Sequence, residues 1–171
     1  MHDAYAVSHW QSLYTTLGGS AAALAGLLFI AVSLQIRRIA VSPIYRARAW
    51  GNTYMIVSLV IDAGLVLTPQ GVTDLGVELL LTPVVFIVTM SVTMRRVVAA
   101  GRRLPWRPFM SIFLNLVCMG AGLSLVTGHG GGMYLVTLYF LATIIWVMWG
   151  AWGLLLAIGE DDADTDAAVR S

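Results

Sequence analysis

Five stretches of mostly apolar residues follow one another along the chain, separated by short connections that are polar or contain glycine and proline. Each stretch reaches the length of about 20 residues that a helix needs to cross the hydrocarbon core of a bilayer. The sequence therefore predicts an all-α integral membrane protein. The predicted transmembrane helices cover about residues 13–36, 50–68, 75–94, 109–127 and 133–158.

Composition supports this class. Hydrophobic residues make up 58% of the chain and charged residues 11%, whereas about a quarter of the residues of a soluble domain are charged. High hydrophobicity also excludes a disordered chain. We expect a single transmembrane domain over residues 1–158, and an acidic, solvated and disordered cytoplasmic tail over residues 159–171. The formal net charge of +1 gives no indication of a nucleic-acid partner.

All ten basic residues are arginines, and nine of them lie in two connections. The first connection holds four and the third holds five: Arg37, Arg38, Arg46 and Arg48, then Arg95, Arg96, Arg102, Arg103 and Arg107. Cytoplasmic connections carry the excess of basic residues in membrane proteins. The pattern therefore predicts an N-terminus outside and a C-terminus in the cytoplasm. We expect the same arginines to contact anionic phospholipids, because basic clusters near a membrane surface attract them.

Small residues recur every four positions in two predicted helices, as Gly18, Ala22 and Gly26 and as Gly120 and Ser124. Such stripes let two helix backbones approach closely. They predict packing either between helices of one subunit or between copies in an oligomer. In the last predicted helix, Trp146 and Trp149 form a tryptophan face near the middle of the membrane, which indicates a tight protein contact, a lipid site or a hydrophobic constriction.

Three polar side chains fall inside apolar stretches: Asp62, Glu78 and Asn115. The two acids are predicted in the outer half of the membrane, within reach of each other across a helical hairpin. A carboxylate at that depth must be paired, protonated or hydrated, because burying an isolated charge is costly. We therefore take the three residues as candidates for an ion pathway. Asp62 has two interpretations that the sequence leaves equal, an ion-interacting group and a buried structural acid kept neutral by desolvation.

The three histidines, His2, His9 and His129, are predicted on the outer side and show no spacing typical of metal ligands. Cys118 is the only cysteine, so neither an intrachain disulfide nor a cysteine cluster for zinc can form. We expect no metal and no cofactor. Because no nucleophile–base pair, paired acid–base group or phosphate-binding motif is present, we also expect no enzymatic activity.

The first half of the chain resembles a family of small, largely uncharacterised bacterial multi-pass membrane proteins. The resemblance rests on the run from Ala23 to Ile36 (ALAGLLFIAVSLQI), on the pairs Arg38-Ile39 and Arg46-Ala47, and on Leu67-Thr68-Pro69-Gln70. It implies a bacterial plasma-membrane (inner-membrane) protein with this number of helices. Some members of the family are described as modulators of a membrane-bound AAA+ protease.

The sequence is compatible with two functions. The first is a homo-oligomeric channel or ion-conducting pore, because nearly the whole chain is membrane helix and carries small-residue stripes and an acid pair. A pore on a symmetry axis needs only one lining helix from each subunit. The second is a non-catalytic accessory subunit or modulator that binds a larger membrane complex through the same stripes.

Overall fold

A computed structural model describes Tyr5, residues 7–99 and residues 106–170 of the chain. These residues form a short 3-10 turn, Val7–Trp10, followed by α1 (Gln11–Leu34), α2 (Ile36–Val41), α3 (Pro43–Leu67), α4 (Val72–Ala99), α5 (Arg107–Thr127) and α6 (Gly132–Arg170). No strand occurs in the described part of the chain. The predicted all-α class is confirmed.

Five helical segments are long and apolar enough to cross a membrane: Val7–Leu34, Ile44–Leu67, Val72–Val92, Pro108–Thr127 and Gly132–Leu156. They match the five predicted spans to within a few residues at most ends. The chain is thus a multi-pass membrane protein by the length and composition of its helices.

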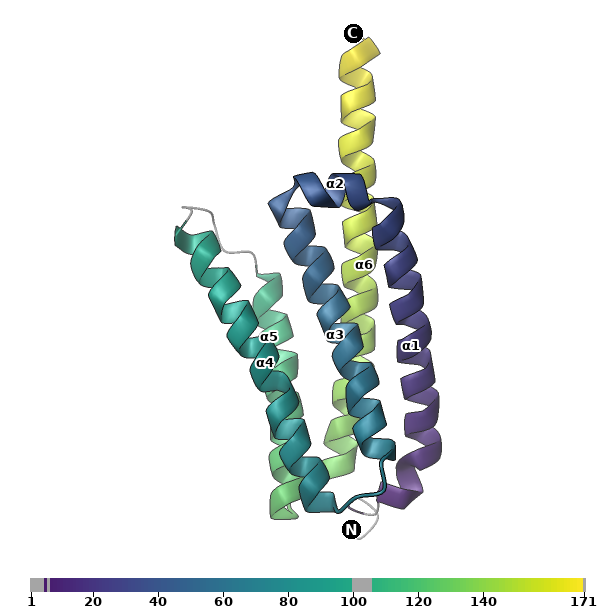
Figure 1. Ribbon diagram of the computed structural model, residues 1–171, viewed down its shortest axis with the longest axis vertical. Coiled ribbons are helices and arrows are strands. Elements are labelled where there is room, and N and C mark those ends of the chain that lie inside the picture. The colour runs from purple at the N-terminus through teal and green to yellow at the C-terminus, as the bar shows by residue number, and fades with distance from the viewer. Residues whose placement is uncertain (1–4, 6, 100–105, 171) are drawn as a thin grey trace.

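The five long helices alternate in direction, so the connections between them lie alternately at the two ends of the bundle (Figure 1). The α3–α4 and α5–α6 turns lie at the end that also holds the N-terminal turn. The short helix α2 lies across the opposite end, together with the last turns of α4 and the first turns of α5. We name the end with α2 the arginine end, because Arg37 and Arg38 lie on α2 and Arg95 lies near the end of α4.

Helix α3 packs against α1 and α6, and α5 packs against α4 and α6. Toward the arginine end, α4 and α5 lean away from α3 (Figure 1). The core between these helices is mainly aliphatic and aromatic, with Tyr14, Leu59, Tyr139 and Phe140 among its fully buried side chains. The ring of Tyr14 meets that of Phe140 edge-on, with centroids 5.2 Å apart, a favourable arrangement for aromatic pairs.

The helix ends follow from the local sequence. Ser42 caps α3 by accepting a hydrogen bond from the Tyr45 backbone N–H at 3.4 Å, and Pro43 occupies the first turn, where no N–H is needed. At the other end of the molecule, α5 stops at Gly128, whose φ of 69° is a left-handed conformation that glycine adopts without strain.

Two features differ from the predicted boundaries. The first helix ends at Leu34, and Gln35 leaves the helical conformation before α2 begins, so residues 36–41 form a separate helix across the arginine end. The acidic tail, predicted to be disordered, continues α6 as helix through Arg170 and projects beyond α2 (Figure 1). Helix formers such as Ala157, Glu160 and Ala163 follow the last span without an intervening proline.

Candidate functional site

Asp62 is the central polar residue of the bundle. Its side chain is 0% exposed, and its Oδ2 atom accepts a hydrogen bond from the Tyr139 hydroxyl at 3.2 Å. Asp62 lies five residues before the end of α3, and Tyr139 lies seven residues after the start of α6. Because α3 and α6 run in opposite directions, these positions meet at one level of the bundle, nearer the end opposite α2.

Three further polar side chains surround this pair, and each comes from a different helix. Ser58 of α3 lies beside the Tyr139 hydroxyl. The Cys118 thiol of α5 also lies close to Tyr139, and Thr82 of α4 lies beside the Asp62 carboxyl group. We name these five residues the Asp62 cluster. Since α3, α4, α5 and α6 all contribute, the cluster forms only when the bundle is assembled.

The hydroxyl and thiol groups of Ser58, Thr82 and Cys118 each have a backbone carbonyl oxygen as acceptor. Ser58 donates to the Met55 carbonyl oxygen at 2.8 Å, and Thr82 donates to the Glu78 carbonyl oxygen at 3.0 Å. The Cys118 thiol points to the Leu79 carbonyl oxygen at 3.7 Å. The Thr82 hydroxyl thus has two acceptors within reach, the Glu78 carbonyl oxygen and the Asp62 carboxyl group.

Buried polar atoms without a hydrogen-bond partner occur at three positions in the described part of the chain: Asp62 Oδ1, Thr143 Oγ1 and Asn52 Nδ2. Thr143 is fully buried on α6 and Asn52 is buried on α3. Leaving a buried donor or acceptor unpaired costs about 1–3 kcal/mol. Each of the three atoms carries this cost unless a small molecule such as water pairs it.

Glu78 lies apart from Asp62. Its Oε2 atom accepts a hydrogen bond from the Gln70 side chain at 2.7 Å, and Gln70 also donates to the Leu65 carbonyl oxygen at 3.0 Å. This half-buried pair lies next to the α3–α4 turn. Asp62 and Glu78 were predicted to lie within reach of each other, and in the described residues each accepts a hydrogen bond from its own donor, Tyr139 or Gln70.

Asn115 lies away from the Asp62 cluster, toward the arginine end. It is 1% exposed, and its Nδ2 atom donates to the Ser111 carbonyl oxygen at 2.8 Å and contacts the Met55 sulfur at 3.4 Å. These contacts tie α5 to α3. In the structure, Asn115 is therefore an interhelical packing residue and does not contact Asp62.

The small-residue stripe of α1 is packed against α3 at one end and exposed at the other. A Cβ atom added at Gly18 would lie 2.8 Å from the Ala63 Cβ of α3, so this glycine serves packing within the chain. Ala22 and Gly26 are exposed, and no atom lies within 4 Å of a Cβ added at Gly26. The stripe thus contributes to packing inside the bundle at one end and leaves an open small-residue surface at the other.

The close approach of α5 to its neighbour uses a different residue from the predicted Gly120. No atom lies within 4 Å of a Cβ added at Gly120, whereas a Cβ at Gly122 would lie 2.7 Å from the Gly76 carbonyl oxygen of α4. Gly76 and Gly122 are thus the crossing point of α4 and α5. Ser124, the second predicted member of the stripe, instead donates a hydrogen bond to the His129 carbonyl oxygen and closes the α5–α6 turn.

The tryptophan face of α6 also separates into two roles. Trp146 is half-buried and donates to the Ser111 hydroxyl at 3.1 Å, and its ring meets that of Trp106 edge-on at 5.7 Å. Trp149 is 69% exposed. Trp146 therefore links α6 to α5 within the chain, and Trp149 lies on the outer surface.

The arginines that the structure describes lie at one end, as the charge pattern requires. Arg37, Arg38, Arg46 and Arg95 are exposed, and Arg48 is half-buried. Arg102 and Arg103 lie outside the described residues, and the side chains of Arg96 and Arg107 are outside them as well.

The histidines do not form a metal site in the described residues. His2 lies outside them, and His9 is exposed. The His129 Nδ1 atom lies 2.7 Å from the Thr127 carbonyl oxygen. No group of three or more His, Cys, Asp or Glu in the described chain could hold a metal ion.

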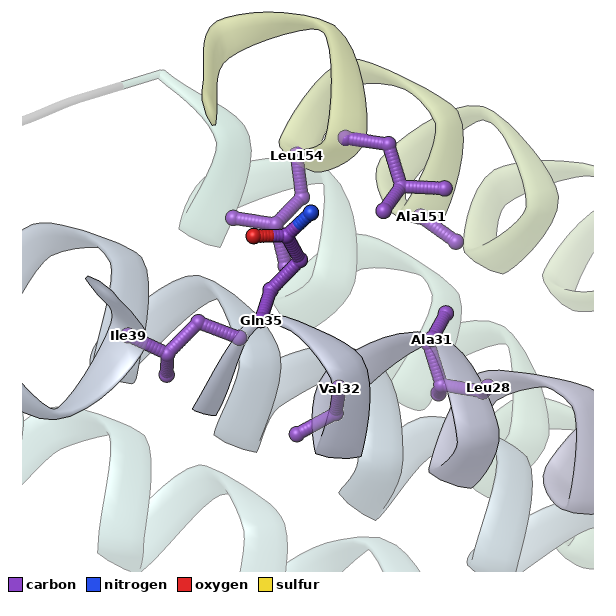
Figure 2. A pocket seen from close by; sticks show the side chains of 8 residues that line it. Leu28, Ala31, Val32, Gln35, Ile39, Ala151 and Leu154 are labelled. Atoms are coloured by element: carbon purple, nitrogen blue, oxygen red, sulfur yellow. The ribbon is translucent and has the colours of Figure 1, made fainter. Parts of the chain in front are cut away.

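An apolar recess lies between the end of α1, α2 and α6 at the arginine end (Figure 2). Its lining consists of Leu28, Ala31, Val32, Gln35, Ile39, Ala151, Leu154 and Leu155. Gln35 is its only polar lining residue. The recess carries no acid, base or nucleophile and is separate from the Asp62 cluster.

Several residues of the site were not identified from the sequence. Ser58 and Asp62 are four residues apart on one face of α3, and Tyr139 and Thr143 are four apart on one face of α6. This four-residue spacing of polar side chains on two helices can be recognised in the sequence. The sequence does not reveal which two helices meet, because their pairing depends on the tertiary packing.

No family model matches this chain, and neither the curated proteins nor the solved structures that were compared with it gave a match.

Proposed function

We propose that the protein is an ion-conducting membrane protein whose path runs through the interior of each bundle, with Asp62 as the cation- or proton-interacting group. The observation that carries this proposal is the fully buried Asp62 carboxyl group, with one oxygen bonded to Tyr139 and the other unpaired. Ionisable residues inside transmembrane bundles are rare and typically mark ion or proton pathways.

The geometry favours a path inside the bundle over one on a symmetry axis between copies. An axial pore is lined by the outer surface of a subunit, and Asp62 does not reach that surface. The exposed side chains of the membrane-spanning helices are mostly apolar, such as Phe29, Val85 and Ile145. Copies that assemble into a homo-oligomer would then each carry their own path.

Ion flux into liposomes tests this proposal. We expect liposomes with the wild-type protein to show flux above that of empty liposomes, and Asp62→Asn to lose cation preference or pH-dependent flux while keeping its size and fold. Asn preserves the shape of the side chain and removes the ionisable proton. Asp74→Asn is the matched control, because this acid is exposed at the start of α4. Absence of flux from wild-type liposomes over a range of pH and voltage would contradict the proposal.

The second candidate function is an accessory subunit or modulator of a larger membrane complex. It is favoured by the exposed Ala22 and Gly26 on α1, because small residues facing the membrane let another helix approach closely. The same surface would serve a homo-oligomer. The resemblance to bacterial membrane proteins supports the bacterial inner membrane as the location in both cases.

Extraction in mild detergent followed by native mass spectrometry distinguishes these assemblies. A closed symmetric ring supports the homo-oligomer, and a monomer that co-purifies with another membrane protein supports the accessory role. The same spectra report bound lipid. We expect anionic phospholipids to be retained more than zwitterionic ones, because exposed arginines such as Arg37 and Arg46 gather at one end.

A further inference from the structure

The three unpaired buried atoms have a common feature that the proposed function does not use: they belong to side chains on the two helices that carry Asp62 and Tyr139. Asp62 and Thr143 are 0% exposed, and Asn52 is 8% exposed. Two of the atoms, Asp62 Oδ1 and Thr143 Oγ1, can accept a hydrogen bond, and the third, Asn52 Nδ2, can donate one. Only a partner small enough to enter a packed core can satisfy such atoms.

Two of the three residues, Asp62 and Thr143, lie along the contact between α3 and α6, which we name the seam. The contact between Asp62 and Tyr139 fixes the register of α3 against α6. Four residues toward the arginine end on both helices, Ser58 and Thr143 therefore lie at the same level. Asn52 lies six residues further along α3, about 9 Å at a rise of about 1.5 Å per residue, and about 120° around the helix axis from Ser58.

The outer end of the same seam is polar as well. Glu78 lies beside the α3–α4 turn, bonded to Gln70, and its carbonyl oxygen accepts the Thr82 hydroxyl proton. Thr82 in turn lies beside Asp62. Polar groups thus follow one another from the turn opposite α2 through Asp62 to Thr143.

The chemistry of the seam suits a proton better than a metal cation. Hard cations such as Mg²⁺ and Ca²⁺ require six or more oxygen ligands, and Asp62 offers one unpaired carboxyl oxygen. A proton requires only a succession of hydrogen-bonding atoms and single bridging waters, each of which makes two to four hydrogen bonds to polar groups.

We propose that the ion conducted by this protein is the proton, which passes from Asp62 to the Thr143 hydroxyl through single internal water molecules, while the Asn52 amide donates a hydrogen bond to a water further along and takes up no proton. This inference rests on the proposed function. A protonated water on the outer side gives its proton to Oδ1 of the Asp62 carboxylate, so one O–H bond of that water breaks as the carboxyl O–H bond forms. The carboxyl group then gives this proton to a water on the inner side and returns to the carboxylate. That water passes a proton to Thr143 Oγ1, which releases its own hydroxyl proton to the next water. Tyr139 keeps its own proton and holds the carboxyl group through Oδ2.

The surroundings of Asp62 are consistent with this role. The titratable side chains nearest to it are Tyr139 on α6, Cys118 on α5 and Tyr54 on α3, and α4 contributes Thr82. None of these side chains is cationic, so no fixed positive charge among them competes with the proton for the carboxylate.

An apolar side chain lies on α3 between the levels of Thr143 and Asn52. Met55 is 1% exposed and lies on α3 between the levels of Ser58 and Asn52. Its sulfur is held by the Asn115 amide at 3.4 Å. Because methionine is unbranched and changes conformation easily, we expect movement of Met55 to limit the rate of proton transfer, and conduction to be slow.

The test compares proton entry with sodium and potassium entry into the same liposomes, using an internal pH dye and an ion-selective flux assay with the membrane potential clamped. We expect proton flux to exceed the flux of either metal ion. Thr143→Val replaces the hydroxyl by a methyl group of similar size and should lower proton flux about tenfold, the effect of losing one hydrogen-bonding site on a barrier. Thr143→Ser restores the hydroxyl and should restore the flux.

Thr16→Val is the control, since this α1 threonine is exposed and bonds only to its own helix at the Ser12 carbonyl oxygen. Sodium or potassium flux without proton flux would overturn the inference and leave the proposed function standing, whereas absence of all flux would overturn both. Undiminished proton flux in folded Thr143→Val would overturn the path. Should that variant fail to fold, Asn52→Leu tests the path in the same way at its inner end.

Discussion

At the scale of single residues, Asp62 and Tyr139 depend on each other. The Tyr139 hydroxyl is buried and donates to Asp62. Asn at position 62 can accept the same hydrogen bond through its oxygen and offer its amide protons to the Thr82 oxygen. Leu can do neither, so the Tyr139 hydroxyl would lose an acceptor in an apolar environment.

We therefore expect Asp62→Asn to unfold at a higher temperature than Asp62→Leu, with a difference of about 1–3 kcal/mol in the free energy of unfolding. Thermal unfolding in detergent measures it. The pair Asp74→Asn and Asp74→Leu serves as the control, because Asp74 is exposed and both variants should stay within about 0.5 kcal/mol of each other. Equal stability of the two Asp62 variants would contradict the structural role of this hydrogen bond.

The sequence identified Asp62 because its depth in an apolar span is visible from position alone. It did not identify Tyr139, because a tyrosine a few residues from a helix start is also typical of the membrane interface. Nor did it separate Asn115, which packs between helices, from Asp62, which has an unpaired oxygen. Partners across helices are set by packing that a single sequence does not reveal.

At the scale of helices, the same distinction separates Gly120 from Gly122. Small residues every four positions indicate which face of a helix can pack closely, but not which neighbour approaches it. In α5 the neighbour is α4, and the contact lies on the face of Gly122, where Gly76 presents its backbone. The extra helix α2 was missed for a related reason, since Gln35 carries no glycine or proline signal for a break.

The matched pair Gly122→Ala and Gly120→Ala tests this crossing. A Cβ at Gly122 would lie 2.7 Å from a backbone oxygen, which cannot move as a side chain can. We expect Gly122→Ala to destabilise the protein by about 1–3 kcal/mol through overpacking. Gly120→Ala should be neutral or slightly stabilising, because nothing lies near the added methyl group and alanine favours helix. Thermal unfolding compares the two, and equal melting temperatures would refute the crossing.

At the scale of the whole molecule, the five membrane-spanning helices run alternately up and down the bundle. The N-terminal turn and α2 therefore lie at opposite ends (Figure 1). The arginine connections and the C-terminal end of α6 thus share one end of the bundle. This charge asymmetry was fully predictable, because it depends only on which connections hold arginine. With the arginine end in the cytoplasm, as the charge pattern predicts, the proposed path would have Glu78 at its outer end and Asn52 toward the cytoplasm.

The orientation itself is testable by cysteine labelling in intact cells. We expect a membrane-impermeant thiol reagent to label Thr73→Cys and His129→Cys, which lie exposed at the end opposite α2, and to leave Ala40→Cys on α2 unlabelled until the membrane is opened. The native Cys118 gives no background, because it is 1% exposed inside the bundle. His129 is a better site than the neighbouring Gly131, whose φ of 79° would strain a cysteine.

A reporter fused after Ser171 should read as cytoplasmic. Labelling of Ala40→Cys from outside would reverse the orientation, and proton entry would then begin at the Asn52 end of the seam.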